Sequence, residues 1–78
     1  MPTLFEIFGL RFFFYGGDHD PIHVHVTNGD GEAKIEINPK IELVYNHGLK
    51  KSEVKKALST VKTYREDIVK AWNENFKK

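Results

Sequence analysis

A short stretch in the first third of the chain alternates between apolar and polar side chains. Ile22, Val24 and Val26 occupy every second position, and His23 and His25 lie between them. Because successive side chains of a β-strand point to opposite faces, the pattern predicts a half-buried strand. The aliphatic residues should face the core, and the two imidazoles should share the other face, about 6.6–7 Å apart.

A second strand should return antiparallel after the turn sequence Asn28-Gly29-Asp30-Gly31, because Asn and Gly tolerate positive φ. Matching the apolar positions of the two strands pairs Val26 with Ala33 and Val24 with Ile35. A slip of one residue would bury charged side chains, so this register is strongly favoured.

The same register places two charged residues beside the histidines. His25 lies opposite Lys34, and His23 lies opposite Glu36. Directly opposed residues of an antiparallel pair share a face, so all four side chains should meet on the polar side of the hairpin.

Two N-terminal segments separated by Gly9 are apolar at most positions, and their Phe, Ile, Leu and Tyr residues favour strands. Leu4 and Phe8 fall on one face while Phe5 and Ile7 fall on the other. A strand that is apolar on both faces is covered twice or exposes a patch for a partner, which favours a homodimer over a monomer. The predicted strands cover residues 3–8, 10–15, 22–27, 32–37 and 41–45, the last with Ile41, Leu43 and Tyr45 on one face.

From Leu49 onward the chain has neither Gly nor Pro, and its apolar residues recur with helical spacing. Ser52 followed by Glu53 resembles a helix N-terminus with an incomplete capping box. One continuous helix of roughly 25 residues would be about 38 Å long and would overhang the sheet or reach a second subunit. The apolar stripe consists of Val54, Ala57, Leu58, Val61, Tyr64, Ile68, Ala71, Trp72 and Phe76.

These elements predict an α+β fold of two layers: a small antiparallel β-sheet of four to five strands with one long C-terminal α-helix packed on one face. Residues 1–78 should form a single domain close to the lower size for an unaided core. The chain has no cysteine, so neither a disulfide nor a thiolate zinc site can stabilise it.

Charge is distributed unevenly although the net charge is only +1. Residues 1–48 hold three basic and seven acidic groups, and residues 49–78 hold nine basic and four acidic groups. Such asymmetry is seen in surfaces for nucleic acid or acidic partners, but lysine-rich helices are more often simply solvated. We favour a solvated face for Lys51, Lys55, Lys62, Lys70 and Lys77.

No apolar run approaches 18 residues and no leader pattern opens the chain, so we expect a cytoplasmic protein without a membrane segment.

The histidine-rich segment offers a metal-site hypothesis. His19, His23 and His25, with Asp18, Asp20 or Glu36 as a carboxylate ligand, would suit a divalent transition metal such as zinc, nickel or iron.

An acid–base hypothesis uses some of the same residues. His23 and His25 would act as general acid and base in a metal-independent ribonuclease, because imidazole titrates near neutral pH. Glu36 would orient His23, and Lys34 would contact the scissile phosphate of RNA.

A third, non-catalytic hypothesis treats the cluster as structural. Asp18 and Asp20 would accept backbone N–H bonds in the turn, and the imidazoles would stack on Phe13 and Tyr15. His47 is then a turn residue, and Trp72 a core or dimer contact.

Almost the whole chain resembles the DUF4160 family of small bacterial proteins, a domain of unknown function. Ile22 departs from the family pattern, which usually has a second proline there. The resemblance rests on Met1-Pro2-Thr3, Phe8-Gly9 with Arg11, Tyr15, the string from Asp18 to Val26, and a helix ending near Trp72.

The resemblance implies a functional context but no catalytic residue. Members of that family look like partners of another small family, DUF2442, in arrangements reminiscent of toxin–antitoxin pairs. We therefore expect one component of a toxin–antitoxin-like or regulatory pair, acting on a cognate protein or RNA. The alternative is a metal-binding or metal-dependent phosphodiesterase-like or ribonuclease-like protein using His19, His23 and His25.

Overall fold

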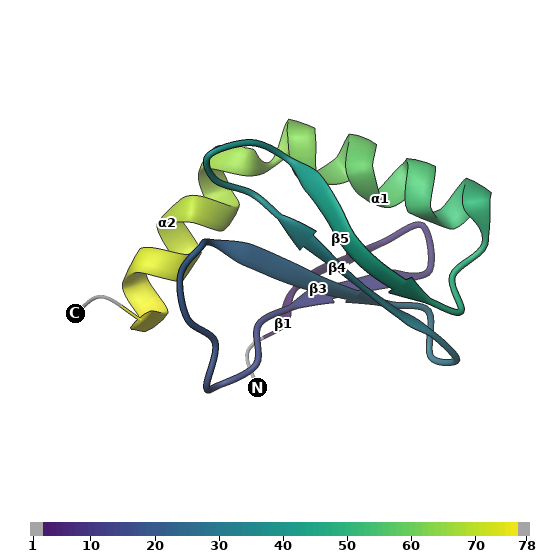
Figure 1. The fold of residues 1–78 in the computed structure, drawn as a ribbon, viewed down its shortest axis with the longest axis horizontal. Helices are drawn as coiled ribbons and strands as arrows, with labels where there is room; N and C mark the ends of the chain where they lie inside the picture. The colour runs from purple at the N-terminus through teal and green to yellow at the C-terminus, as the bar shows by residue number, and fades with distance from the viewer. Residues whose placement is uncertain (1–2, 77–78) are drawn as a thin grey trace.

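The computed structural model describes residues 3–76, which form a five-stranded antiparallel sheet and two helices (Figure 1). The α+β class predicted from the sequence is confirmed. The strands are β1 (Thr3–Ile7), β2 (Leu10–Phe13), β3 (His23–Thr27), β4 (Glu32–Glu36) and β5 (Glu42–His47). The helices are α1 (Lys51–Thr63) and α2 (Arg65–Phe76).

The strands follow one another in space in the order in which they occur in the chain. Each pairs antiparallel with the next, as short connections between consecutive strands favour. The register predicted for the central hairpin is confirmed: Val24 lies opposite Ile35, and His25 opposite Lys34. The apolar pattern was sufficient here because any slip would have exchanged the two faces.

The hydrophobic core lies between one face of the sheet and the two helices (Figure 1). Aliphatic and aromatic side chains from β2, β3 and β4 meet the buried sides of α1 and α2. The buried core residues are Leu10, Phe12, Phe14, Ile22, Val24, Val26, Ala33, Ile35, Ile37, Leu49, Ala57, Val61, Ile68 and Trp72.

The prediction of one long helix was wrong, because the helix is interrupted at Tyr64 (φ −106°, ψ 21°). Arg65 donates hydrogen bonds to the Ile37 carbonyl (3.4 Å) and to the Asn38 side chain (3.1 Å), which ties the junction to the end of β4. After the bend, α2 turns along one end of the sheet (Figure 1). Trp72 is consequently buried within its own chain rather than overhanging it.

Helix α1 also begins slightly earlier than the predicted start at Ser52. The cap is Lys50, so Glu53 occupies the third helical position, and its carboxylate accepts the Lys50 N–H at 2.9 Å. The Asn28 amide donates to the same carboxylate at 3.0 and 3.2 Å. Glu53 therefore joins the start of α1 to the β3–β4 turn.

Strand β5 departs from the predicted face pattern. Lys34 is opposite Tyr45 and Ile35 is opposite Leu43, with an irregularity between these pairs. A bulge that opposes two residues to one reverses the alternation beyond it. Leu43 therefore shares the face of the core residue Ile35, whereas Tyr45 shares the face of the histidines.

Strand β2 is covered on both faces. This is the first of the two alternatives that the sequence left open for an N-terminal strand with two apolar faces. Phe13 is buried there against Tyr15 and His25, with ring centroids 5.1 and 5.6 Å away. Arg11 lies over the same ring at 4.8 Å.

Among the lysines expected on a solvated face, Lys51, Lys55, Lys62 and Lys70 are exposed; Lys77 lies outside the described residues, as do Met1 and Pro2. Within residues 3–76, neither helix has the apolar length needed to cross a bilayer.

Candidate metal centre

The β2–β3 connection folds back over the polar face of the sheet through a tight turn. Gly16 and Gly17 lie at its centre, between Tyr15 and Asp18. The Asp18 N–H donates to the Tyr15 carbonyl at 3.2 Å, and the Asp18 carboxylate accepts the Tyr15 N–H at 2.9 Å. These reciprocal bonds hold the carboxylate of Asp18 above β3.

His23 is held through both ring nitrogens. Nδ1 lies 2.8 Å from the Pro21 carbonyl oxygen, and Nε2 lies 3.2 Å from Asp18 Oδ1. The ring also packs against Trp72 of α2, with centroids 5.1 Å apart. The side chain is 5% exposed, so its orientation is set by surrounding protein rather than by solvent.

His25 lies on the same strand face as His23, with ring centroids 5.1 Å apart, and is 5% exposed. Its Nε2 is 3.4 Å from each Asp18 oxygen. Its Nδ1 lies 3.3 Å from Glu32 Oε2, although this contact is not aligned as a hydrogen bond. The imidazole is therefore placed between two carboxylates.

Glu32 is in turn held by two phenols. Tyr15 donates to Oε1 at 2.6 Å, and Tyr45 donates to Oε2 at 3.1 Å. The bond to Glu32, followed by burial, raises the pKa of Tyr15 to about 12, and burial followed by the same kind of bond raises the pKa of Tyr45. Both phenols therefore remain protonated donors at neutral pH.

Burial is the main influence on His25. Desolvation lowers its pKa from the ordinary value of 6.5, against the opposing attraction of Asp18 and Glu32. A lowered pKa keeps the imidazole neutral at pH 7, which is the form that coordinates metals.

Asp18, His23 and His25 form the group best placed to hold a metal ion. Each offers one ligand atom, and the three atoms lie within 4.8 Å of one another. A tetrahedral zinc site with bonds of about 2.0–2.1 Å has ligand atoms about 3.3–3.4 Å apart. The separations of 3.2 and 3.4 Å between Asp18 Oδ1 and the two imidazole nitrogens match that spacing. The three atoms as a set lie within 4.8 Å, so the two imidazoles would move closer together around an ion.

The contacts of His23 determine which of its two nitrogens is available to a metal ion. A carbonyl oxygen can only accept, so the contact with Pro21 requires the proton on Nδ1. In neutral His23 the Nε2 lone pair then faces the carboxylate of Asp18, placing two acceptors 3.2 Å apart. That arrangement is unfavourable unless a cation lies between them, either a second proton or a metal ion.

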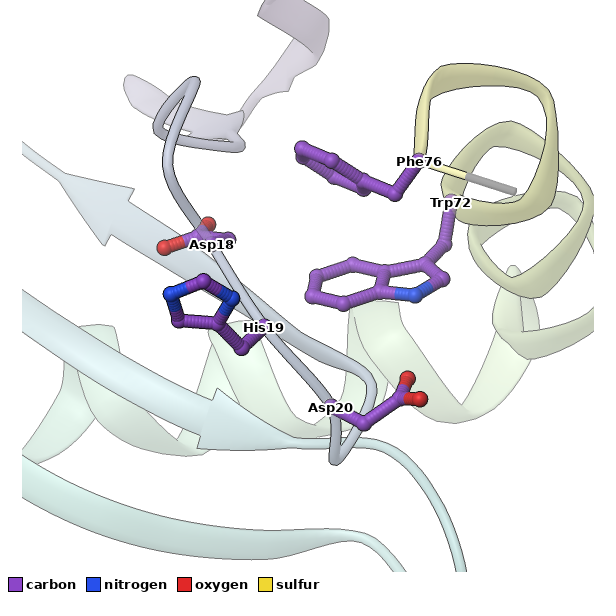
Figure 2. A pocket seen from close by; sticks show the side chains of 5 residues that line it. All are labelled: Asp18, His19, Asp20, Trp72 and Phe76. Carbon is purple, nitrogen blue, oxygen red and sulfur yellow. The ribbon is translucent and has the colours of Figure 1, made fainter. Parts of the chain in front are cut away.

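The loop also borders two hollows. One, of about 340 Å³, is lined by both buried histidines, Asp18, His19, Lys34 and other residues of the loop and β5. The other, of about 390 Å³, has Asp18, His19 and Asp20 of the loop on one side and Trp72 and Phe76 of α2 on the other (Figure 2). The candidate ligands therefore border space from which an ion or small molecule can approach.

The predicted site residues come together only in part. Asp18, His23 and His25 converge, while His19 is exposed on the loop outside the ligand group. Glu36 lies opposite His23 as predicted, but both nitrogens of His23 face other groups. Lys34 has the predicted position beside His25 and lines the hollow.

The sequence placed Tyr15 against the imidazoles, and its ring centroid lies 4.4 Å from that of His25. It did not predict Glu32 or Tyr45 beside His25, nor the bond from the Tyr15 hydroxyl to Glu32. The contact with Glu32 could have been predicted from the hairpin register, because Glu32 lies diagonally across the hairpin from His25. Nothing in the sequence predicted the position of Tyr45, because the face on which it lies depends on the irregularity in the β4–β5 pairing.

Comparison with known proteins gives one match. The model of a family described as a domain of unknown function (DUF4160) matches residues 9–73. No curated protein and no solved structure matches the chain.

Proposed function

Because the chain belongs to the DUF4160 family, whose function is unknown, we propose a function from the site itself: the protein binds one divalent transition-metal ion through Asp18, His23 and His25. Two imidazoles and one carboxylate suit zinc and its neighbours. Three protein ligands leave at least one coordination position for water or a ligand.

The observation that carries the proposal is the placement of His23, whose Nδ1 lies against the Pro21 carbonyl and whose Nε2 lies 3.2 Å from the Asp18 carboxylate. The supporting shell adds to it. Metal-bound histidines usually donate their second nitrogen to a carbonyl or a carboxylate. His23 has the Pro21 carbonyl in that position, and the Nδ1 atom of His25 has the Glu32 carboxylate 3.3 Å away, close but not aligned as a hydrogen bond.

The acid–base alternative is less favoured by the same geometry. A general acid or base must reach the substrate directly or through one water. His23 and His25 are 4% and 5% exposed, and their nitrogens are directed at Asp18. The hollow of about 340 Å³ is lined by Asp18 and Asp20 and by one lysine, Lys34. This balance of charge favours a cation over a phosphate at this position.

The test is a calorimetric titration of untagged, chelator-treated protein with Zn²⁺ and Co²⁺. We expect one equivalent to bind, and Asp18→Asn, His23→Gln and His25→Gln each to weaken binding at least 100-fold. Glu32→Gln should weaken it about 10- to 100-fold, as removal of a supporting partner does.

Two histidines outside the ligand group provide matched controls. His19→Gln removes an exposed loop histidine beside the site, and His47→Gln removes one at the end of β5. Both should retain the wild-type affinity. Less than a tenth of an equivalent bound by folded wild-type protein, or an equal loss in His19→Gln, would contradict the proposed ligand set.

We propose a protein partner as a second function, supported by the edge strand β5. Among residues 3–76, β5 has one strand neighbour, β4, and its Leu43 and Val44 are 36% and 49% exposed. An exposed apolar edge can accept a strand from another chain. The occupant that we propose is the small DUF2442-like protein implied by the resemblance.

Co-expression with such a protein from the neighbouring gene tests this proposal. We expect a one-to-one complex by light scattering, lost in Val44→Lys and retained in Lys70→Gln on α2. A homodimer that Val44→Lys dissociates would instead assign the edge to a second copy. Equal binding by the wild type and Val44→Lys would remove β5 from the interface.

A further inference from the structure

The β1–β2 turn holds a strained and exposed aromatic residue. Ile7 pairs with Leu10, so Phe8 and Gly9 form a two-residue turn in which both have positive φ (57° and 73°). Asn or Gly normally occupies the first position of such a turn, because a bulky residue is strained there. Phe8 is nonetheless 64% exposed, so the fold gains little packing from its ring.

The surroundings of Phe8 are basic. A hollow of about 390 Å³ is lined by Phe8 and by four residues of α1: Ser52, Lys55, Lys56 and Ser59. These four positions recur at three- and four-residue intervals, so they form one helix face. Its described lining holds two lysines and no carboxylate, and the Lys56 ammonium lies 5.6 Å from the centre of the Phe8 ring.

The combination suits a ligand with a planar aromatic part and a negative charge. Proteins that bind single-stranded nucleic acid combine exposed aromatic rings, on which bases stack, with lysines that contact phosphates. Ser52 and Ser59 add hydroxyl donors. Residues held in sparsely populated backbone conformations also cluster at functional sites.

We propose that Phe8, Lys55 and Lys56 form a binding site for a single-stranded nucleic-acid segment. One base stacks on the free side of the Phe8 ring, and the adjoining phosphates contact the two ammonium groups. The site is separate from the metal centre, since none of its residues lines either hollow beside Asp18. It also changes the interpretation of Lys55, which the sequence alone assigned to a merely solvated face.

Fluorescence anisotropy with labelled ten-nucleotide RNA and DNA strands tests the site over a range of salt concentrations. We expect Phe8→Ala to weaken binding of single strands about tenfold, and Phe8→Tyr, which keeps a stacking ring, to restore it. Lys55→Gln with Lys56→Gln should weaken binding and reduce the slope of log affinity against log salt by about 1.4.

Matched lysine variants distinguish a site from diffuse attraction. Lys62→Gln with Lys70→Gln removes the same charge from exposed positions elsewhere on the helices. This pair should leave both the affinity and the salt slope close to those of the wild type. An equal loss in both lysine pairs, tighter binding of a duplex, or wild-type affinity in Phe8→Ala would each overturn the proposal.

Discussion

Phe8 shows how a single residue can oppose the local preference of its turn. A non-glycine residue in the left-handed region costs roughly 1–2 kcal/mol. Phe8 has a φ of 57° and a largely exposed side chain, so the surrounding packing recovers little of that cost. The strain is explained if the ring is retained for binding rather than for stability.

Phe8→Asn should therefore stabilise the protein by about 1 kcal/mol, because Asn-Gly is the preferred sequence for this turn. Urea denaturation followed by circular dichroism measures the change. Ile7→Ala, beside the turn but partly buried, should instead destabilise it. A lower urea midpoint for Phe8→Asn than for the wild type would mean that the ring contributes packing that its exposure does not suggest.

The phenol of Tyr15 reports on the carboxylate that supports His25. Because its proton is held by Glu32, the Tyr15 pKa is raised to about 12. Glu32→Gln removes the charge and should move this pKa toward 10.0, observed as phenolate absorbance at lower pH. Glu36→Gln, on the same face of β4, is the control and should leave the titration unchanged.

The sign of the linked stability follows from the raised pKa. The folded state favours the protonated phenol, so the stabilisation is complete below pH 10 and is lost as pH rises from 10 to about 12. A free energy of unfolding that does not fall between pH 10 and about pH 12 would contradict the hydrogen bond from Tyr15 to Glu32.

At the scale of elements, the helical region is the clearest difference between the predicted and observed fold. The apolar stripe continues through Tyr64, so periodicity alone supports one straight helix. The bend depends on Arg65, whose guanidinium reaches Ile37 and Asn38 of a distant segment. Since a helical pattern describes only which face is apolar, it cannot report a contact of this kind.

The start of α1 depends on the charge of Glu53, whose bonds to the Lys50 N–H and the Asn28 amide lower its pKa from 4.5. A lowered pKa means that the stabilisation is present above pH 4.5 and is lost as pH falls through the folded-state value. Glu53→Gln should thus reduce the melting temperature at pH 7 by about 2–5 °C and have a smaller effect at pH 3, where more of the carboxyl group is protonated.

Melting curves recorded by circular dichroism at both pH values check this prediction. Glu66→Gln, an exposed substitution in the first turn of α2, serves as the charge-matched control. An equal loss at pH 3 and pH 7 would show that the carboxylate charge of Glu53 plays no part in the cap.

At the scale of the molecule, Trp72 connects the core to the candidate metal centre. Its ring packs on Phe14 and Phe76, with centroids 5.3 and 4.5 Å away, and on His23 at 5.1 Å. The bend before α2 is what allows this indole to reach the end of the sheet. Folding of the helical layer and orientation of His23 are therefore coupled.

Trp72→Ala should cost about 3–5 kcal/mol, as truncation of a buried Trp does. Domains of this size are stable by only about 4–12 kcal/mol, so the loss should be a large part of the total free energy of unfolding. Trp72→Phe, which keeps an aromatic ring beside His23, should lose less than half as much. Denaturant unfolding followed by far-ultraviolet circular dichroism measures both, and a loss below 1 kcal/mol in Trp72→Ala would contradict the burial of this residue.

The sequence by itself determined the register of the β3–β4 hairpin and the shared face of His23 and His25. Both follow from local alternation, because a slip of one residue would bury Lys34 and expose Val24. Only the tertiary structure decided which groups meet these histidines. Asp18 arrives by the folding back of a loop, Tyr45 by an irregularity in an edge strand, and Trp72 by a bend in the helical layer. Tyr45 and Trp72 depend on contacts with segments far apart in the chain, and Asp18 depends on the conformation of the turn that begins at Tyr15. Periodicity within a segment encodes neither.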